Sequence, residues 1–106
     1  MNNETYASRF AQELQARFGH NYTFQVSPGR RFDKIVQSPV ERSSTEGFVH
    51  AFVERETGAL IKSAGWNQPQ KNSDGSLAVR YNLADEHDYR RATDSADPYG
   101  SYLYVR

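Results

Sequence analysis

The sequence predicts an α+β fold, in which an N-terminal helix and a short C-terminal helix pack on a mainly antiparallel sheet of about four to five strands. Three observations predict it. Apolar residues recur every four positions near the N-terminus, several central segments alternate apolar and polar residues, and turn-forming residues separate those segments at short intervals. Short hairpin connections of this kind place neighbouring strands antiparallel.

An amphipathic helix is predicted over residues 3–18, with Asn3 as its N-cap and Gly19 as its stop. Its apolar stripe consists of Tyr6, Phe10, Leu14 and Phe18. We expect this stripe to face the core.

Residues 22–37 are expected to form two strands around the turn at 27–30, where Pro28 and Gly29 favour a reversal of the chain. The return segment alternates imperfectly, which predicts a β-bulge or an edge strand. The polar residues 38–47 are expected to form a loop.

The clearest element is a hairpin over residues 48–66, with arms FVHAFVE and ALIKSAGW joined by residues 55–58. Gly58 suits the left-handed position of the turn. The register stays open, because a loop of three or four residues changes which side chains face each other.

After the hairpin, residues 67–76 contain almost no apolar side chains and predict a flexible, exposed loop. Residues 77–83 alternate and predict a strand. Residues 85–96 predict a helix with Asp85 as N-cap. The ending SYLYVR (101–106) predicts a final strand.

Composition limits the function classes. The 106 residues suit one domain, 1–106, and 13 basic residues balance 13 acidic ones, which disfavours a polybasic binder. No cysteine is present, so disulfides and thiolate chemistry are excluded. Neither a membrane-spanning run nor a signal-peptide pattern is found, and we expect a protein that acts in the cytoplasm away from membranes.

No pattern typical of an enzyme is found. The three histidines, His20, His50 and His87, lack metal-ligand spacing, and nucleophile, phosphate-loop and dinucleotide motifs are absent. His50 lies among apolar residues of a predicted strand, which favours a structural role. We therefore expect neither catalysis nor a cofactor or metal.

One set of residues suggests a binding surface. Basic side chains inside predicted strands, together with a nearby Trp, can hold phosphates and stack on bases. The candidate ligand-binding residues are Lys34, Lys62, Trp66, Arg80 and Tyr104. The alternative is that the basic residues lie on the solvent face of the sheet and that Trp66 fills the core.

The segment GALIKSAGWNQP resembles a hairpin in small, poorly characterised proteins of tailed bacteriophages, especially phages of actinobacteria. The shared form is FV-x-x-x-TG-x-(I/L)-x-K-(A/S)-A-(G/S)-W-x-x-P. The matching residues here are Phe52-Val53, Thr57-Gly58, Ile61, Lys62, Ser63-Ala64-Gly65-Trp66 and Pro69. The segments PGRRFDKIV, RYNL and DPYGSYLYVR are also similar, so the resemblance extends over residues 20–106. It implies a phage accessory protein made inside the infected host, and it implies no activity.

Two functions follow as hypotheses. The first is a phage-encoded binding protein that acts in the host cytoplasm through a basic-aromatic surface for nucleic acid or a nucleotide-like ligand. The alternative is a protein-interaction module that inhibits or modifies a host protein, or a minor structural or oligomeric phage protein. The final strand would offer an edge for homodimer formation.

Overall fold

The computed structural model describes residues 5–40 and 47–103, which form one antiparallel sheet, two α-helices and a short 3-10 helix. The strands are β1 (Tyr22–Ser27), β2 (Phe32–Pro39), β3 (Phe48–Glu54), β4 (Ala59–Gly65), β5 (Gln68–Pro69) and β6 (Val79–Asn82). The spatial order is β1-β2-β3-β4-β5, and β6 pairs with β4. The α+β class with a mainly antiparallel sheet is therefore confirmed.

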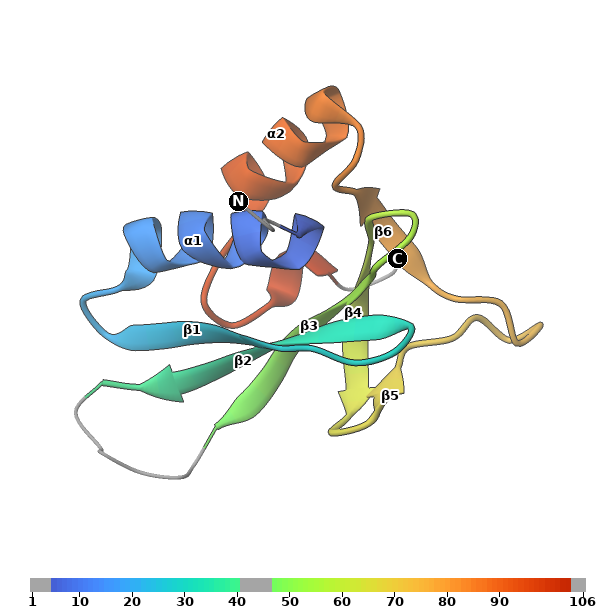
Figure 1. Cartoon of the computed structure of the whole chain (residues 1–106), viewed down its shortest axis with the longest axis horizontal. Helices are drawn as coiled ribbons and strands as arrows, with labels where there is room; N and C mark the ends of the chain where they lie inside the picture. Colours follow the sequence, from blue (N-terminus) through green and yellow to red (C-terminus); the bar gives the residue numbers. More distant parts are fainter. Residues whose placement is uncertain (1–4, 41–46, 104–106) are drawn as a thin grey trace.

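Both helices, α1 (Tyr6–Phe18) and α2 (Glu86–Ser95), lie on the same side of the sheet (Figure 1). Phe10 and Leu14 of the predicted stripe pack there, with Phe18 partly buried beside them. The prediction is wrong for Tyr6, which is exposed because it lies at the start of α1. Fully buried members of this main core are Ala7, Phe10, Leu14, Ile35, Ala51, Val53, Leu60, Ala92 and Leu103. This helix-covered side supplies most of the buried apolar area that stabilises the fold.

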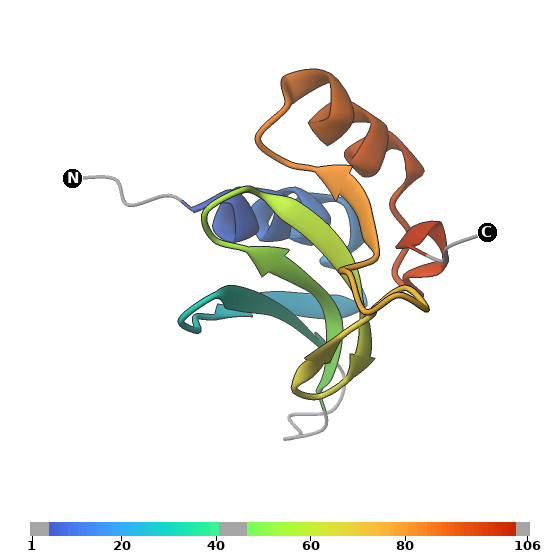
Figure 2. The ribbon, with the colours of Figure 1, turned by 90° about the vertical axis from the view of Figure 1, so that its right-hand side faces the viewer.

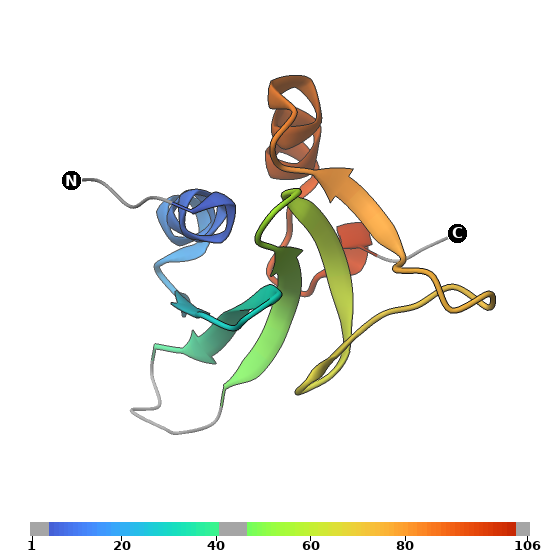
Figure 3. The same ribbon diagram turned by 45° about the vertical axis from the view of Figure 1, so that its right-hand side comes forward.

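The other face of the sheet carries a second, smaller apolar cluster. It consists of Val49, Phe52, Ala59 and Ile61, with Phe32 and Leu77 packed partly buried against them. Neither described helix covers this face, and the segment after β5 projects away from the sheet (Figures 1 and 3). The sheet twists strongly, so that β1 and β2 run across the rising β3 and β4 (Figure 2).

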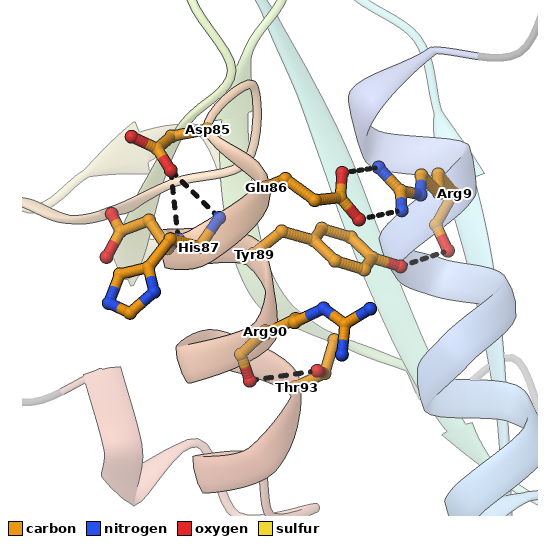
Figure 4. A network of polar contacts seen from close by, with 8 residues as sticks. Arg9, Asp85, Glu86, His87, Tyr89, Arg90 and Thr93 are labelled. Atoms are coloured by element: carbon orange, nitrogen blue, oxygen red, sulfur yellow. Dashed lines mark hydrogen bonds and ion pairs between the residues drawn. The ribbon is translucent and has the colours of Figure 1, made fainter.

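The two helices are joined by Arg9 of α1 (Figure 4). Its guanidinium makes a bidentate pair with Glu86 of α2, at 3.1 and 2.8 Å. The same group lies over the ring of Tyr89, 3.9 Å from the centroid, and the Tyr89 hydroxyl donates to the Arg9 carbonyl. This contact sets where α2 sits against α1.

The helix ends follow capping chemistry. α1 begins at Tyr6 with Thr5 as N-cap: the Thr5 hydroxyl accepts from the Ser8 N–H (3.1 Å), and the Ser8 hydroxyl accepts from the Thr5 N–H (3.0 Å). The prediction of Asn3 as N-cap is therefore wrong, because this capping box starts the helix later. Asp85 is confirmed as the N-cap of α2, accepting from the N–H groups of His87 and Asp88.

The central hairpin is confirmed, and its register is now defined. Ala51 pairs with Lys62 and Phe52 with Ile61, while Gly58 has φ +80° at the turn. A bulge also occurs, but its extra residue is in β3: Ile35 pairs with Ala51 and Val36 with Val49, which leaves out His50. The edge-strand alternative is wrong, because β2 lies between β1 and β3.

Three predictions in the C-terminal half need correction. The predicted loop 67–76 contains β5, which pairs back on β4, and the strand predicted over 77–83 is the shorter β6. The final segment is a 3-10 helix over Ser101–Leu103, not a strand, and residues 104–106 lie outside the described residues. Asp97 causes the difference, because its carboxylate accepts from the N–H groups of Tyr99 and Ser101 and curls the chain.

Over the ranges that the structure describes, no helix has the length and apolar character needed to cross a membrane.

Candidate functional site

The tight turn between β4 and β5 places Trp66 on the surface. Gly65 pairs with Gln68, so Trp66 and Asn67 form the tip of this turn. The Trp66 side chain is 54% exposed. The alternative that Trp66 fills the core is therefore wrong, and the reason is that β4 ends one residue before it.

Lys34 lies directly against this tryptophan. Its Nζ is 4.8 Å from the centroid of the Trp66 ring and donates to Asn67 Oδ1 at 2.6 Å. Lys34 pairs with Phe52, so it points to the face of the sheet that lacks the helices. Lys34 of β2 and Trp66 of the β4–β5 turn are thus two predicted site residues that lie far apart in the sequence and that the fold brings together.

A second pair of cation and aromatic ring lies on the same face. The Arg31 guanidinium carbon is 4.9 Å from the centroid of the Phe32 ring. Phe32 packs edge-to-face on Phe52, with centroids 6.1 Å apart, and the Arg31 Nε donates to Glu54 at 2.8 Å. An arginine held at Nε keeps the donors of its two terminal nitrogens for another partner.

A groove of about 460 Å³ adjoins both pairs. Phe32, Pro69 and Leu77 give it apolar walls. Its polar groups are Arg31, Asn67, Gln68 and Lys71. We call this groove, together with Lys34 and Trp66 beside it, the basic-aromatic groove. Its volume falls in the range of small-ligand sites, and its mixture of flat apolar walls and cationic groups suits an anionic, planar ligand.

The other predicted site residues lie elsewhere. Lys62 pairs with Ala51, which belongs to the main core, so Lys62 points to the opposite side from Lys34. There its Nζ donates to the Ser63 carbonyl at 3.2 Å, and it lines a separate hollow of about 150 Å³ with His50 and Tyr99. The structure does not bring Lys62 to Trp66.

Arg80 is not part of the groove either. Leu60 pairs with Tyr81 and Ile61 with Val79, so Arg80 is the extra residue at a break in the β4–β6 register. It is half-buried, and its Nε has no hydrogen-bond partner among the described residues. Tyr104 lies outside the described residues.

Several groove residues were missed from the sequence: Arg31, Phe32, Asn67, Gln68, Lys71 and Leu77. The alternation of side chains along a strand could have predicted Phe32 as a site residue, because it lies two residues before Lys34 and therefore on the same face of β2. The residues after Trp66 carried no such signal, since only the pairing of β5 folds them back onto the sheet.

His50 has the structural role that its sequence context favours. Its Nδ1–H donates to Gln37 Oε1 (2.8 Å), which can only accept, so Nε2 accepts from the Tyr102 hydroxyl (2.7 Å). Burial lowers the pKa of His50 from 6.5 to about 4, against the opposing effect of Asp97. Burial, with Asp97 and Tyr81 adding to it, raises the pKa of Tyr102. A neutral histidine therefore ties the C-terminal segment to β3.

The hollow beside His50 is lined, among the described residues, by no carboxylate. Within the same ranges, no three His, Asp or Glu side chains lie close enough to hold a metal ion. His50 thus has two hydrogen-bond partners, Gln37 and Tyr102, that account for its position.

Fold and groove together define a small α+β domain with an open basic-aromatic groove on the face of the sheet opposite its helices. Residues 1–105 match the model of the family of unknown function DUF7717, and the chain belongs to that family. No curated protein and no solved structure matches the chain.

Proposed function

We propose that this protein binds a nucleotide-containing ligand in the basic-aromatic groove. The observation that carries the proposal is the position of Lys34 over the half-exposed ring of Trp66, beside a groove that is lined by two further cations, Arg31 and Lys71. An exposed aromatic face stacks on a base, and lysine and arginine bind phosphate. The resemblance of the hairpin to phage proteins supports placing this binding in a phage-infected cell, in the host cytoplasm.

Trp66 is the single tryptophan of the chain, so its fluorescence reports on this site alone. Titration with nucleoside monophosphates and with single-stranded oligonucleotides at several salt concentrations tests the proposal. We expect quenching whose affinity falls as salt rises. If neither kind of ligand changes the fluorescence, and labelled oligonucleotides show no binding, the proposed function is wrong.

A second candidate function, protein binding, rests on a different surface. Tyr99 is 80% exposed and Phe48 is 47% exposed, and both border the small hollow beside His50. Aromatic residues of this kind are frequent at interface centres. A host protein that binds the wild type but not a Tyr99→Ala variant would support this function, and equal binding of both would argue against it. Light scattering tests the homodimer, whose predicted edge strand is not found over residues 101–103.

A further inference from the structure

We infer that the basic-aromatic groove binds two consecutive nucleotides of a single strand, one base on Trp66 and its neighbour on Phe32. This rests on the proposed function and specifies its ligand. The site contains the same unit twice, a cation lying over an aromatic ring: Lys34 over Trp66 and Arg31 over Phe32. A site for one free nucleotide would need only one such unit.

The two units lie side by side on one surface. Phe32 and Lys34 are alternate residues of β2 and point to the same face, about 7 Å apart along the strand. The turn that carries Trp66 contacts Lys34 on that face through Asn67, and Phe32 and Asn67 both line the groove. Successive bases of one strand can therefore reach both rings.

In the free protein Lys34 lies over one face of the Trp66 ring and Arg31 over one face of the Phe32 ring. A base that stacks on the covered face displaces the cation from it. The displaced groups stay within reach of the phosphates attached to those bases, where charge-assisted hydrogen bonds replace the cation–ring contacts. Lys71 supplies a third positive charge from the segment after β5.

A single strand fits this arrangement better than the other anionic polymers. In a duplex the base faces are stacked inside the helix and only their edges are accessible, so the two rings would find no partner. An acidic peptide could pair with the cations but would bring no flat groups for Trp66 and Phe32. Single-stranded binding sites use both a charged track and stacking rings.

The full chain is tested with thymidine monophosphate, a thymidine dinucleotide and a thymidine octanucleotide, using Trp66 quenching. One stacked base contributes about 1–3 kcal/mol, so the dinucleotide should bind about 5- to 150-fold tighter than the mononucleotide. Beyond two nucleotides, each added nucleotide should raise the affinity much less than the second one does. With three cations, the logarithm of the affinity for the octanucleotide should fall with log salt at a slope of about −2.

Variants assign the two base positions. Phe32→Leu keeps an apolar side chain on Phe52 but removes the flat ring, so the ratio of dinucleotide affinity to mononucleotide affinity should fall toward one. Arg31→Gln should reduce the salt slope by about 0.7, and Arg90→Gln on the exposed face of α2 serves as the matched control with no such effect. If Phe32→Leu does not fold, the inference is tested by the dependence of wild-type affinity on oligonucleotide length and by the salt slope of Arg31→Gln.

The outcomes distinguish failure of the two-nucleotide inference from failure of the proposed nucleotide binding. Equal affinity for mononucleotide and dinucleotide overturns the two-nucleotide inference and leaves the proposed function standing. Binding of duplex DNA as tight as that of the single strand, or displacement of the octanucleotide by oligoglutamate at equal charge, also overturns it. If the protein binds none of the nucleotide ligands, the two-nucleotide inference and the proposed function are both wrong.

Discussion

The buried histidine makes the stability of the fold depend on pH. The pKa of His50 is about 4 in the folded protein, because burial disfavours the imidazolium, and about 6.5 in the unfolded chain. Between these values the unfolded chain binds a proton that the folded protein does not. Acidification therefore favours unfolding, so the stability contributed by neutral His50 is present above pH 6.5 and is lost as pH falls toward 4.

The size of the effect follows from the shift. A difference of about 2.5 pKa units at 1.36 kcal/mol each gives about 3 kcal/mol in total, of which about 2 kcal/mol is lost between pH 7 and pH 5. Protonation of carboxylates changes the free energy of unfolding little between pH 7 and pH 5. The pKa of Glu54, for example, is lowered by hydrogen bonds from Thr57 and Arg31, so its contribution is lost only below its unfolded pKa near 4.5.

Urea unfolding followed by far-ultraviolet circular dichroism at pH 7 and pH 5 measures this loss. His50→Gln removes the titrating group, and its free energy of unfolding should change much less between the two pH values. The same pH dependence in the wild type and in His50→Gln would refute the reasoning. So would an NMR titration that finds the His50 ring protonated near pH 6.5 in the folded protein.

Three further predictions concern stability. Gly58→Ala should destabilise the fold by at least about 1–2 kcal/mol, because alanine is strained at φ +80° and its Cβ would lie 2.8 Å from the Ala84 nitrogen. Gly75→Ala has a similar φ of +88° but open space around it, so it should destabilise the fold less. Equal shifts of the two variants in thermal melts would contradict this. Thr5→Ala should lower the free energy of unfolding by about 1 kcal/mol through loss of the capping box, with Thr5→Ser near wild type in urea titrations. Trp66→Ala should change stability by no more than about 0.5 kcal/mol, since the side chain is half exposed, and a larger loss by calorimetry would mean that Trp66 is a core residue.

The elements that the sequence predicted correctly are those whose signal is local. The four-residue recurrence of apolar side chains predicted α1, and a carboxylate ahead of an acidic first turn predicted Asp85 as a cap. The hairpin of β3 and β4 followed from β-forming arms around Thr57-Gly58, where only a left-handed residue closes the turn. Each of these depends on neighbours within a few residues.

The candidate site was only partly predictable, because it depends on register. Lys34 pairs with Phe52 and Lys62 with the adjacent Ala51, so the two lysines point to opposite faces of the sheet. That result required the register of three paired strands, β2, β3 and β4. No single segment contains it.

Local patterns in the sequence predict the class of fold, the central hairpin, and the basic and aromatic residue types from which a binding surface could be built. Which of these residues meet depends on the pairing of the strands. The tertiary structure paired β5 with β4, which exposed Trp66 at the turn beside Lys34 and Asn67. It also joined the Tyr102 hydroxyl to His50, in a segment that forms a 3-10 helix instead of the predicted strand. Local preference sets the conformation of a segment, whereas the faces that its side chains share are set by pairings between residues distant in the chain.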